Sequence, residues 1–120
     1  MDQREIAIIA AKALDAKRAK DIVVLKVEEM TVITDYMVIA TGTSAPQVKA
    51  LCEQVEDELA KVDVFARRRE GVNDGHWCVL DYGDVMVHVF HEQDREYYQL
   101  ERLWADGTNE VQVDYDAEEA

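Results

Sequence analysis

The chain has 120 residues, of which 48% are hydrophobic, and carries a formal net charge of −13 from 13 basic and 26 acidic residues. This length fits one domain with a packed core, and no apolar run approaches the ~20 residues that a membrane-spanning helix needs. An acidic chain is repelled by phosphate backbones and attracted by basic proteins, so direct nucleic-acid binding is disfavoured as its main activity.

In chain order, the first predicted element is a helix, because apolar residues near the N-terminus recur with the spacing i, i+3, i+4, i+7. These residues are Ile6, Ile9, Ala10 and Ala13, followed by Ala16 or Lys17. The β-branched run at residues 21–27 then predicts a strand with both faces covered. Residues 35–42 predict a second strand, so the chain is expected to begin as one helix and two strands.

A second helix is predicted from residue 44 onward, and two signals mark its start. Ser44 followed by Gln47 fits a capping box, and Pro46 is tolerated in the first turn of a helix. One apolar stripe then continues, and it consists of Val48, Leu51, Val55, Leu59 and Val62. Residues 64–71 are expected to form a short strand or a connector, and residues 71–75 are expected to form a loop.

A β-hairpin is predicted around Tyr82–Gly83, because an X–Gly pair lies between two alternating apolar segments. Successive side chains of a strand point to opposite faces of its sheet. In the first arm, Trp77, Val79 and Asp81 share one face, and Cys78, Leu80 and Tyr82 share the other. In the second arm, Val85, Val87 and Val89 share one face, and Met86, His88 and Phe90 share the other.

A last helix is predicted after the hairpin, since Tyr97, Leu100 and Trp104 lie at i, i+3 and i+7. Leu103 widens this stripe, and Gly107 ends the helix. We assign Phe90, Leu100 and Leu103 to the core. Two interpretations stay open for Trp77, Tyr97, Tyr98 and Trp104, namely core packing and recognition of a partner protein.

This order of elements predicts a single α/β domain with a mixed β-sheet and flanking helices. The hairpin is antiparallel, whereas the strand–helix–strand crossover permits parallel pairing. The domain is expected to cover residues 1–105, and residues 106–120 are expected to form an acidic, flexible C-terminal tail. Its acids are Asp106, Glu110, Asp114, Asp116, Glu118 and Glu119.

The two cysteines, Cys52 and Cys78, are far apart in the sequence and have no metal-binding spacing. We expect reduced thiols in the core of a cytoplasmic protein rather than a disulfide. The N-terminus agrees with this location, because it lacks the basic start and continuous apolar block of a signal peptide.

Three groups of residues resemble parts of catalytic or ligand-binding motifs, but none is specific. The turn Thr41–Ser44 precedes a helix, where a phosphate can bind, yet it lacks a Walker lysine and a spaced glycine series. Asp81 and Asp84 flank a two-residue turn, where aspartate is common without any magnesium ion. His88 and His91, considered as zinc ligands with Asp84, straddle a strand end and need not converge. We therefore expect no enzyme, no cofactor and no metal.

Four segments together resemble the ribosomal silencing factor family, RsfS, also called Iojap. They are ITDYMVIATGTSAPQVKALCEQV at residues 33–55, the pair Glu70–Gly71, WCVLDYGDVMVHVF at 77–90, and REYYQLERLW at 95–104. Each segment alone is modest evidence, but the ordered set is highly specific. The resemblance covers residues 3–105, which is nearly the whole chain apart from the tail.

This resemblance implies a nucleotidyltransferase-like fold without the catalytic motif, and a homodimer. It also implies a repressor of translation under nutrient limitation, which binds the large ribosomal subunit through ribosomal protein number fourteen and blocks association with the small subunit. Pro46 departs from the family pattern, because relatives often have arginine there. The family's shared motif falls on Asp35, Gly42, Ser44, Gln47, Val48, Glu70, Gly71, Trp77, Asp81, Gly83, Asp84, Val87, His88, Tyr98, Leu100, Glu101, Leu103 and Trp104.

We expect the ribosomal protein to dock on amphipathic side chains of the hairpin and the last helix. These are Trp77, Asp81, His88, Tyr98, Glu101 and Trp104. An acidic binder associates faster with a basic ribosomal protein, and steric blocking needs no turnover. Two alternatives are a divergent nucleotidyltransferase-like magnesium enzyme that uses Asp81 and Asp84, and an adaptor whose partner is not the ribosome.

Overall fold

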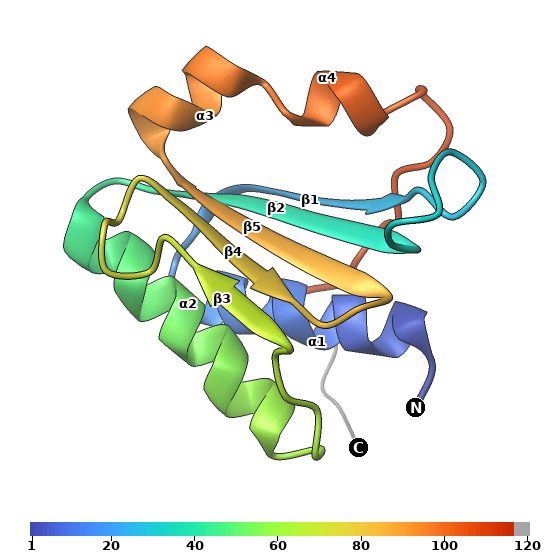
Figure 1. Ribbon diagram of the computed structural model, residues 1–120, viewed down its shortest axis with the longest axis horizontal. Helices are drawn as coiled ribbons and strands as arrows, with labels where there is room; N and C mark the ends of the chain where they lie inside the picture. Colours follow the sequence, from blue (N-terminus) through green and yellow to red (C-terminus); the bar gives the residue numbers. More distant parts are fainter. Residues whose placement is uncertain (117–120) are drawn as a thin grey trace.

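Five segments pair into one β-sheet in the computed structural model, which describes residues 1–116 (Figure 1). The strand order is β1-β2-β5-β4-β3, in which β2 and β5 are parallel and every other pair is antiparallel. This confirms the α/β class with a mixed sheet and flanking helices. The elements are α1 (Gln3–Ala16), β1 (Lys20–Lys26), β2 (Tyr36–Gly42), α2 (Ala45–Ala60), β3 (Arg68–Glu70), β4 (Trp77–Asp81), β5 (Val85–His91), α3 (Glu92–Tyr98) and α4 (Glu101–Trp104).

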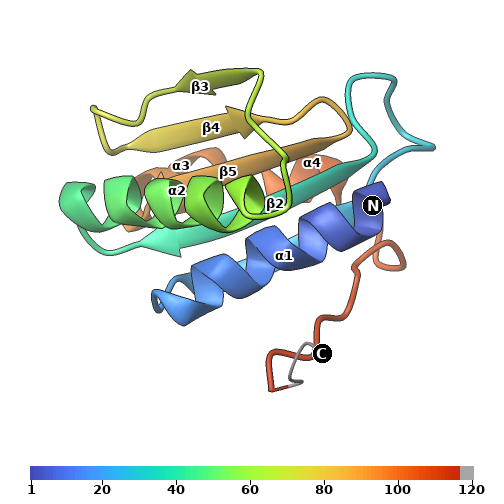
Figure 2. The same ribbon diagram turned by 90° about the horizontal axis from the view of Figure 1, so that it is seen from below.

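Helices cover both faces of the sheet, but unequally. The long helices α1 and α2 lie side by side across one face, and the short helices α3 and α4 lie over the other (Figures 1 and 2). All seven residues of β2 are buried, because it has a strand on each side and helices on both faces. The core therefore has two layers, and one of them lies under α3 and α4.

The N-terminal ends of both long helices are capped by side chains. The Asp2 carboxylate accepts a hydrogen bond from the Glu5 amide at 2.8 Å, and the Ser44 hydroxyl accepts one from the Gln47 amide at 3.2 Å. The Gln47 side chain reaches back to Thr43, whose amide donates to its Oε1 at 2.6 Å. The predicted capping box thus forms with a shift of one residue, and it fixes the start of α2.

The buried stripe of α1 differs from the predicted one. Alanines and one leucine face the core, and these are Ala7, Ala10, Ala11, Ala13 and Leu14. Ile6 and Ile9 pack at the margin of this stripe, and Ala16 is exposed. Small side chains allow α1 to approach α2 and the sheet closely, so alanine occupies the centre of the contact. In α2 the predicted stripe is confirmed except at Val62, which lies beyond the end of the helix and is exposed.

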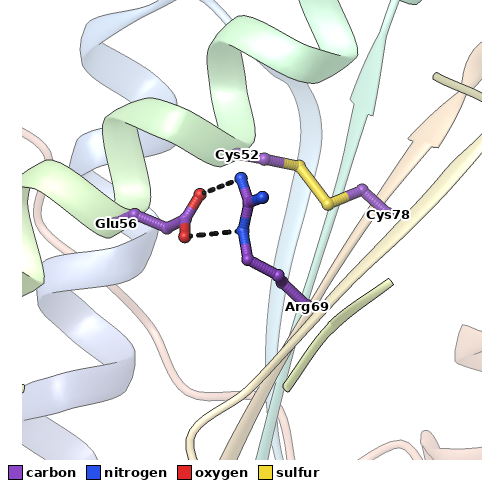
Figure 3. Close-up of polar contacts among 4 residues, drawn as sticks. All are labelled: Cys52, Glu56, Arg69 and Cys78. Atoms are coloured by element: carbon purple, nitrogen blue, oxygen red, sulfur yellow. Dashed lines mark hydrogen bonds and ion pairs between the residues drawn. A yellow bond between two sulfur atoms is a disulfide. The ribbon is translucent and has the colours of Figure 1, made fainter. Parts of the chain in front are cut away.

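The cysteines correct one expectation. Cys52 on α2 and Cys78 on β4 are both buried, as predicted, but they are joined in a disulfide (Figure 3). The expectation of reduced thiols is therefore wrong, because α2 packs directly on β4 and brings two residues 26 positions apart together. Nearby, Arg69 and Glu56 form two parallel hydrogen bonds of 3.0 Å, which also link β3 to α2.

The predicted last helix is divided into α3 and α4. Gln99 lies between them in the left-handed conformation, with φ 48° and ψ 49°. The break turns α4 relative to α3, so Leu103 is 70% exposed and the prediction that it belongs to the core is wrong. Phe90 is fully buried as predicted, and Leu100 packs against the same cluster.

The segment after α4 returns along the outer edge of β1. The Lys26 amide donates to the Asn109 carbonyl at 2.9 Å, and the Val111 amide donates to the Val24 carbonyl at 2.8 Å. Val111 belongs to the buried core. The packed part of the chain thus extends past residue 105, whereas Glu118 and Glu119 of the acidic tail lie outside the described residues. Among residues 1–116, no helix has the length and apolarity to cross a membrane.

Candidate protein-binding surface

The face of the sheet opposite α1 and α2 is only partly covered. There α3 packs against β5 and β2, and the side chains of Leu100 and Trp104 pack over Leu25, Met37 and Phe90 of the sheet. The outward side chains of the neighbouring strands β4 and β3 are half-buried or exposed, and so is Met86 at the start of β5. We call this surface the open face; it comprises Arg68, Glu70, Trp77, Val79, Asp81 and Met86, with Tyr98 at its border.

Strand register places these side chains next to one another. Asp81 pairs with Arg68 on one side and with Met86 on the other. Directly opposed residues in antiparallel strands point to the same face of the sheet. Val79 lies between Glu70 and His88 in the same way. The open face thus combines apolar side chains with charges of both signs.

Trp77 is the centre of an aromatic cluster at one border of the open face. Its ring stacks on Phe90 with 4.8 Å between centroids, and it contacts the Tyr98 ring at the same distance. Its indole N–H donates to His88 Nδ1 at 3.1 Å. The indole is therefore held by two rings and one hydrogen bond, which fixes its orientation before any partner arrives.

His88 supports Trp77 from beneath. Its side chain is only 5% exposed, and burial lowers its pKa to about 4, so the ring is neutral near pH 7. Because Nδ1 accepts from Trp77, the proton must lie on Nε2, which has no hydrogen-bond partner among the described residues. The structure thus places His88 under the surface that Trp77 and Tyr98 present.

The predicted site residues of α3 and α4 differ in how much they expose. Tyr98 is 49% exposed, whereas Trp104 is half-buried on the core cluster. The Glu101 carboxylate accepts a hydrogen bond from Arg95 Nε at 3.1 Å. That arginine is buried and also donates to Thr41 Oγ1 at 2.8 Å. Glu101 therefore connects α4 to α3 across the break, and its carboxylate is only partly exposed.

Asp81 has a clear role in the hairpin turn. Its Oδ1 accepts a hydrogen bond from the Gly83 amide at 2.7 Å, which is a typical aspartate turn. The Asp84 carbonyl accepts from the amides of Asp35 and Tyr36, which ties the turn to the start of β2. Within residues 1–116, no three histidine, cysteine or acidic side chains are grouped so that they could hold a metal ion.

Gly71 explains one shared motif of the resemblance. Its φ is +73°, and a Cβ there would collide with the carbonyl oxygen of Trp77. Only glycine fits this approach, because other residues adopt positive φ at a cost and would also need space for a side chain. The Glu70–Gly71 pair thus positions the first residue of β4, which is Trp77.

Three exposed or half-buried residues of this region were not among the predicted site residues. Val79 and Met86 extend the open face, and their alternation with buried neighbours is the signal that could have indicated them. Tyr97 is 81% exposed and lies edge-on to Tyr98 with 5.0 Å between centroids. Tyr97 belongs to α3, whereas the exposure of Leu103 on α4 follows from the break at Gln99, for which the sequence carries no recognisable signal.

Comparisons with known proteins give consistent results. Residues 1–120 match the family described as "Ribosomal silencing factor during starvation", RsfS. The chain is 42% identical over 106 residues to a ribosomal silencing factor RsfS of Bacillus subtilis, covering 88% of this chain and 90% of the relative. It is 34% identical over 103 residues to the chloroplastic protein Iojap of Zea mays, covering 85% of this chain and 44% of that protein. A crystal structure of a Chromobacterium violaceum protein has 36% identity and a TM-score of 0.85, over 94% of this chain and 96% of that one.

Proposed function

The chain belongs to the ribosomal silencing factor family, and from this we propose that it binds the large ribosomal subunit through ribosomal protein number fourteen. Bound there, it blocks association with the small subunit and so represses translation under nutrient limitation. The protein acts as a homodimer in the cytoplasm, and it needs neither a cofactor nor catalytic turnover, because occupation of the joining surface is sufficient.

One observation carries most weight for the position of the docking site. Trp77 and Tyr98 form a pre-organised aromatic pair beside a sheet face that the helices leave open. Trp and Tyr dominate the binding energy of protein interfaces, because a rigid apolar ring with a polar tip gains much area at a small entropy cost. A protein partner therefore fits this surface better than a small molecule or a nucleic acid does.

The charge of the chain supports the same partner class. The net charge of −13 favours a basic protein over RNA phosphates. The carboxylates of Asp81 and Glu101 lie on the same side of the sheet as the aromatic pair. Contacts between these acids and basic side chains of the ribosomal protein would set the orientation of docking, and the aromatic side chains would supply most of the affinity.

The decisive experiment is a subunit-joining assay. Purified large subunits are incubated with the protein and then with small subunits, and sedimentation separates joined ribosomes from free subunits. We expect the protein to sediment with large subunits and to reduce joining at saturation. The variant Trp77→Ala should need roughly ten times more protein for the same effect. The control Phe65→Ala, which removes an exposed aromatic residue outside the open face, should behave like the wild type.

Two results would reject the proposal. Normal joining at saturating protein would exclude steric blocking. Binding that persists when large subunits lack ribosomal protein fourteen would exclude that partner. A calorimetric titration with nucleotide and magnesium tests the enzyme alternative, because a pure binding protein should release no heat.

A further inference from the structure

Asn109 connects three parts of the chain through one side chain. Its Nδ2 donates to the carbonyl of Trp104 at 2.8 Å and to the carbonyl of Lys26 at 3.0 Å. Its Oδ1 accepts a hydrogen bond from the Asp106 amide at 2.9 Å. The side-chain amide of Asn109 therefore joins the last residue of α4, the end of β1 and the turn that follows α4.

The backbone around Asn109 is fixed as firmly as its side chain. Its carbonyl accepts from the Lys26 amide, and two residues later the Val111 amide donates to Val24. Glu110 forms a bridge with Leu25 between these two bonds. Figure 1 shows this segment leaving α4 and returning past the end of β1. We call residues 106–113 the strap.

Helix α4 depends on contacts from outside itself. It has only four residues and no side-chain cap at its N-terminus. It begins two residues after Gln99, which has the left-handed conformation. Helices this short are unstable alone, and the carbonyls of their last turn have no partner within the helix. Asn109 provides the partner for the Trp104 carbonyl, so the strap determines where α4 ends and how its last side chain is presented.

Trp104 is half-buried against the same buried cluster as Trp77. We infer that its exposed part joins Trp77 and Tyr98 in contacting the partner, that the strap is part of the docking apparatus, and that Asn109 is a positioning residue that holds Trp104 in place. This inference rests on the function proposed above and deepens it. The acidic segment after α4 then contributes to binding through the position of Trp104, in addition to any effect of its charge.

A matched pair of substitutions tests this role. Asn109→Asp keeps the acceptor for the Asp106 amide but loses both donors, and Gln112→Glu makes the same chemical change at an exposed position of the strap that has no such hydrogen bonds. We expect Asn109→Asp to bind purified large subunits roughly tenfold more weakly, mainly through faster dissociation. Gln112→Glu should bind like the wild type. Asn109→Ala, measured beside them, should reproduce the loss without an added charge.

A double-mutant cycle separates positioning from general stability. In a Trp104→Ala background, Asn109→Asp should cause no further loss of binding, because the side chain that it positions is absent. Equal losses in both backgrounds, or unchanged binding of both Asn109 variants, would overturn the inference. Thermal unfolding of each variant shows that the compared proteins are folded.

A measurement without ribosomes keeps this inference distinct from the proposed function. In a Trp77→Phe background, Trp104 is the only tryptophan of the chain. Its quenching by acrylamide should rise about twofold or more with Asn109→Asp and stay unchanged with Gln112→Glu, because a released α4 exposes the half-buried indole. Unchanged quenching would refute the positioning role even if the protein binds ribosomes. Increased quenching with no ribosome binding would support the role and reject the proposed function.

Discussion

Among single residues, Trp77 and His88 illustrate how a binding side chain is oriented from below. The indole N–H is satisfied by a buried neutral imidazole, and the indole ring stacks on Phe90 and Tyr98. A protonated His88 would carry a hydrogen on both ring nitrogens, so it could not accept from Trp77. The neutral state of His88 is thus a condition for the observed position of Trp77.

The first prediction concerns pH and stability. Burial lowers the pKa of His88 from 6.5 to about 4, so the unfolded chain takes up this proton first as the pH falls. The stability that the neutral His88 contributes is therefore fully present above pH 6.5, decreases progressively between pH 6.5 and about 4, and is absent at lower pH. Over this pH range the free energy of unfolding should fall by about 3 kcal/mol because of His88. Urea unfolding at pH 7 and pH 4.5 should show a smaller decrease for His88→Gln than for the wild type, and equal decreases would contradict the argument.

The second prediction concerns Tyr98 as a contact residue. Its side chain is half exposed, and its ring contacts those of Trp77, Phe90 and Tyr97. Tyr98→Ala should weaken binding to large subunits by ~1–3 kcal/mol, because it removes an aromatic ring that contacts the partner. The free energy of unfolding should change less than in Trp77→Ala, whose ring is more deeply packed. Affinity equal to that of the wild type, in a folded variant, would remove Tyr98 from the docking site.

At the scale of secondary-structure elements, the third prediction concerns the break between α3 and α4. Gln99 is a non-glycine residue at positive φ, which costs about 1 kcal/mol relative to glycine. Gln99→Gly should therefore raise the free energy of unfolding by a few tenths to about 1 kcal/mol. The control Glu96→Gly lies in the exposed interior of α3 and should lower it by about 1 kcal/mol. Destabilisation by both substitutions would show that the left-handed conformation carries no strain.

The elements that could be predicted from the sequence are those that local patterns specify. Ser44 and the apolar stripe after it indicate α2, and alternation around Gly83 indicates the hairpin with its two faces. The break at Gln99 could not be predicted, because glycine is the usual signal for this conformation and glutamine is not. The break between α3 and α4 is held by the buried Arg95, which donates hydrogen bonds to Glu101 on α4 and to Thr41 on β2. These contacts arise only in the folded molecule.

For the whole molecule, contacts between distant segments account for what the sequence could not show. The concentration of tryptophan and tyrosine in residues 75–104 is visible in the sequence and is enough to indicate the aromatic residues of the site. The depth of His88 under Trp77, and the return of the strap to β1, depend on how the strands are ordered in the sheet. The pairing of Cys52 with Cys78 likewise follows from the packing of α2 on β4. Local periodicity carries no information about such contacts.

The last prediction concerns the net charge of −13 and the rate of association. Charge attraction between an acidic protein and a basic ribosomal protein acts at long range and is screened over about 10 Å at 0.1 M salt. Raising KCl from low to moderate concentration at fixed magnesium should therefore slow association with large subunits several-fold, while dissociation changes little. Stopped-flow measurements with labelled protein give both rates.

Two variants that each remove one charge test which face of the molecule contributes to this electrostatic attraction. Glu96→Gln removes an exposed acid of α3, the helix that carries Tyr98, and Glu53→Gln removes an exposed acid of α2 on the opposite face of the sheet. Each raises the net charge by one, but the acid closer to the docking surface contributes more to the attraction that guides the partner. Glu96→Gln should therefore slow association more than Glu53→Gln at low salt, and the difference should disappear as salt rises. Equal effects of the two variants would place the docking surface elsewhere, and an association rate independent of salt would exclude electrostatic steering altogether.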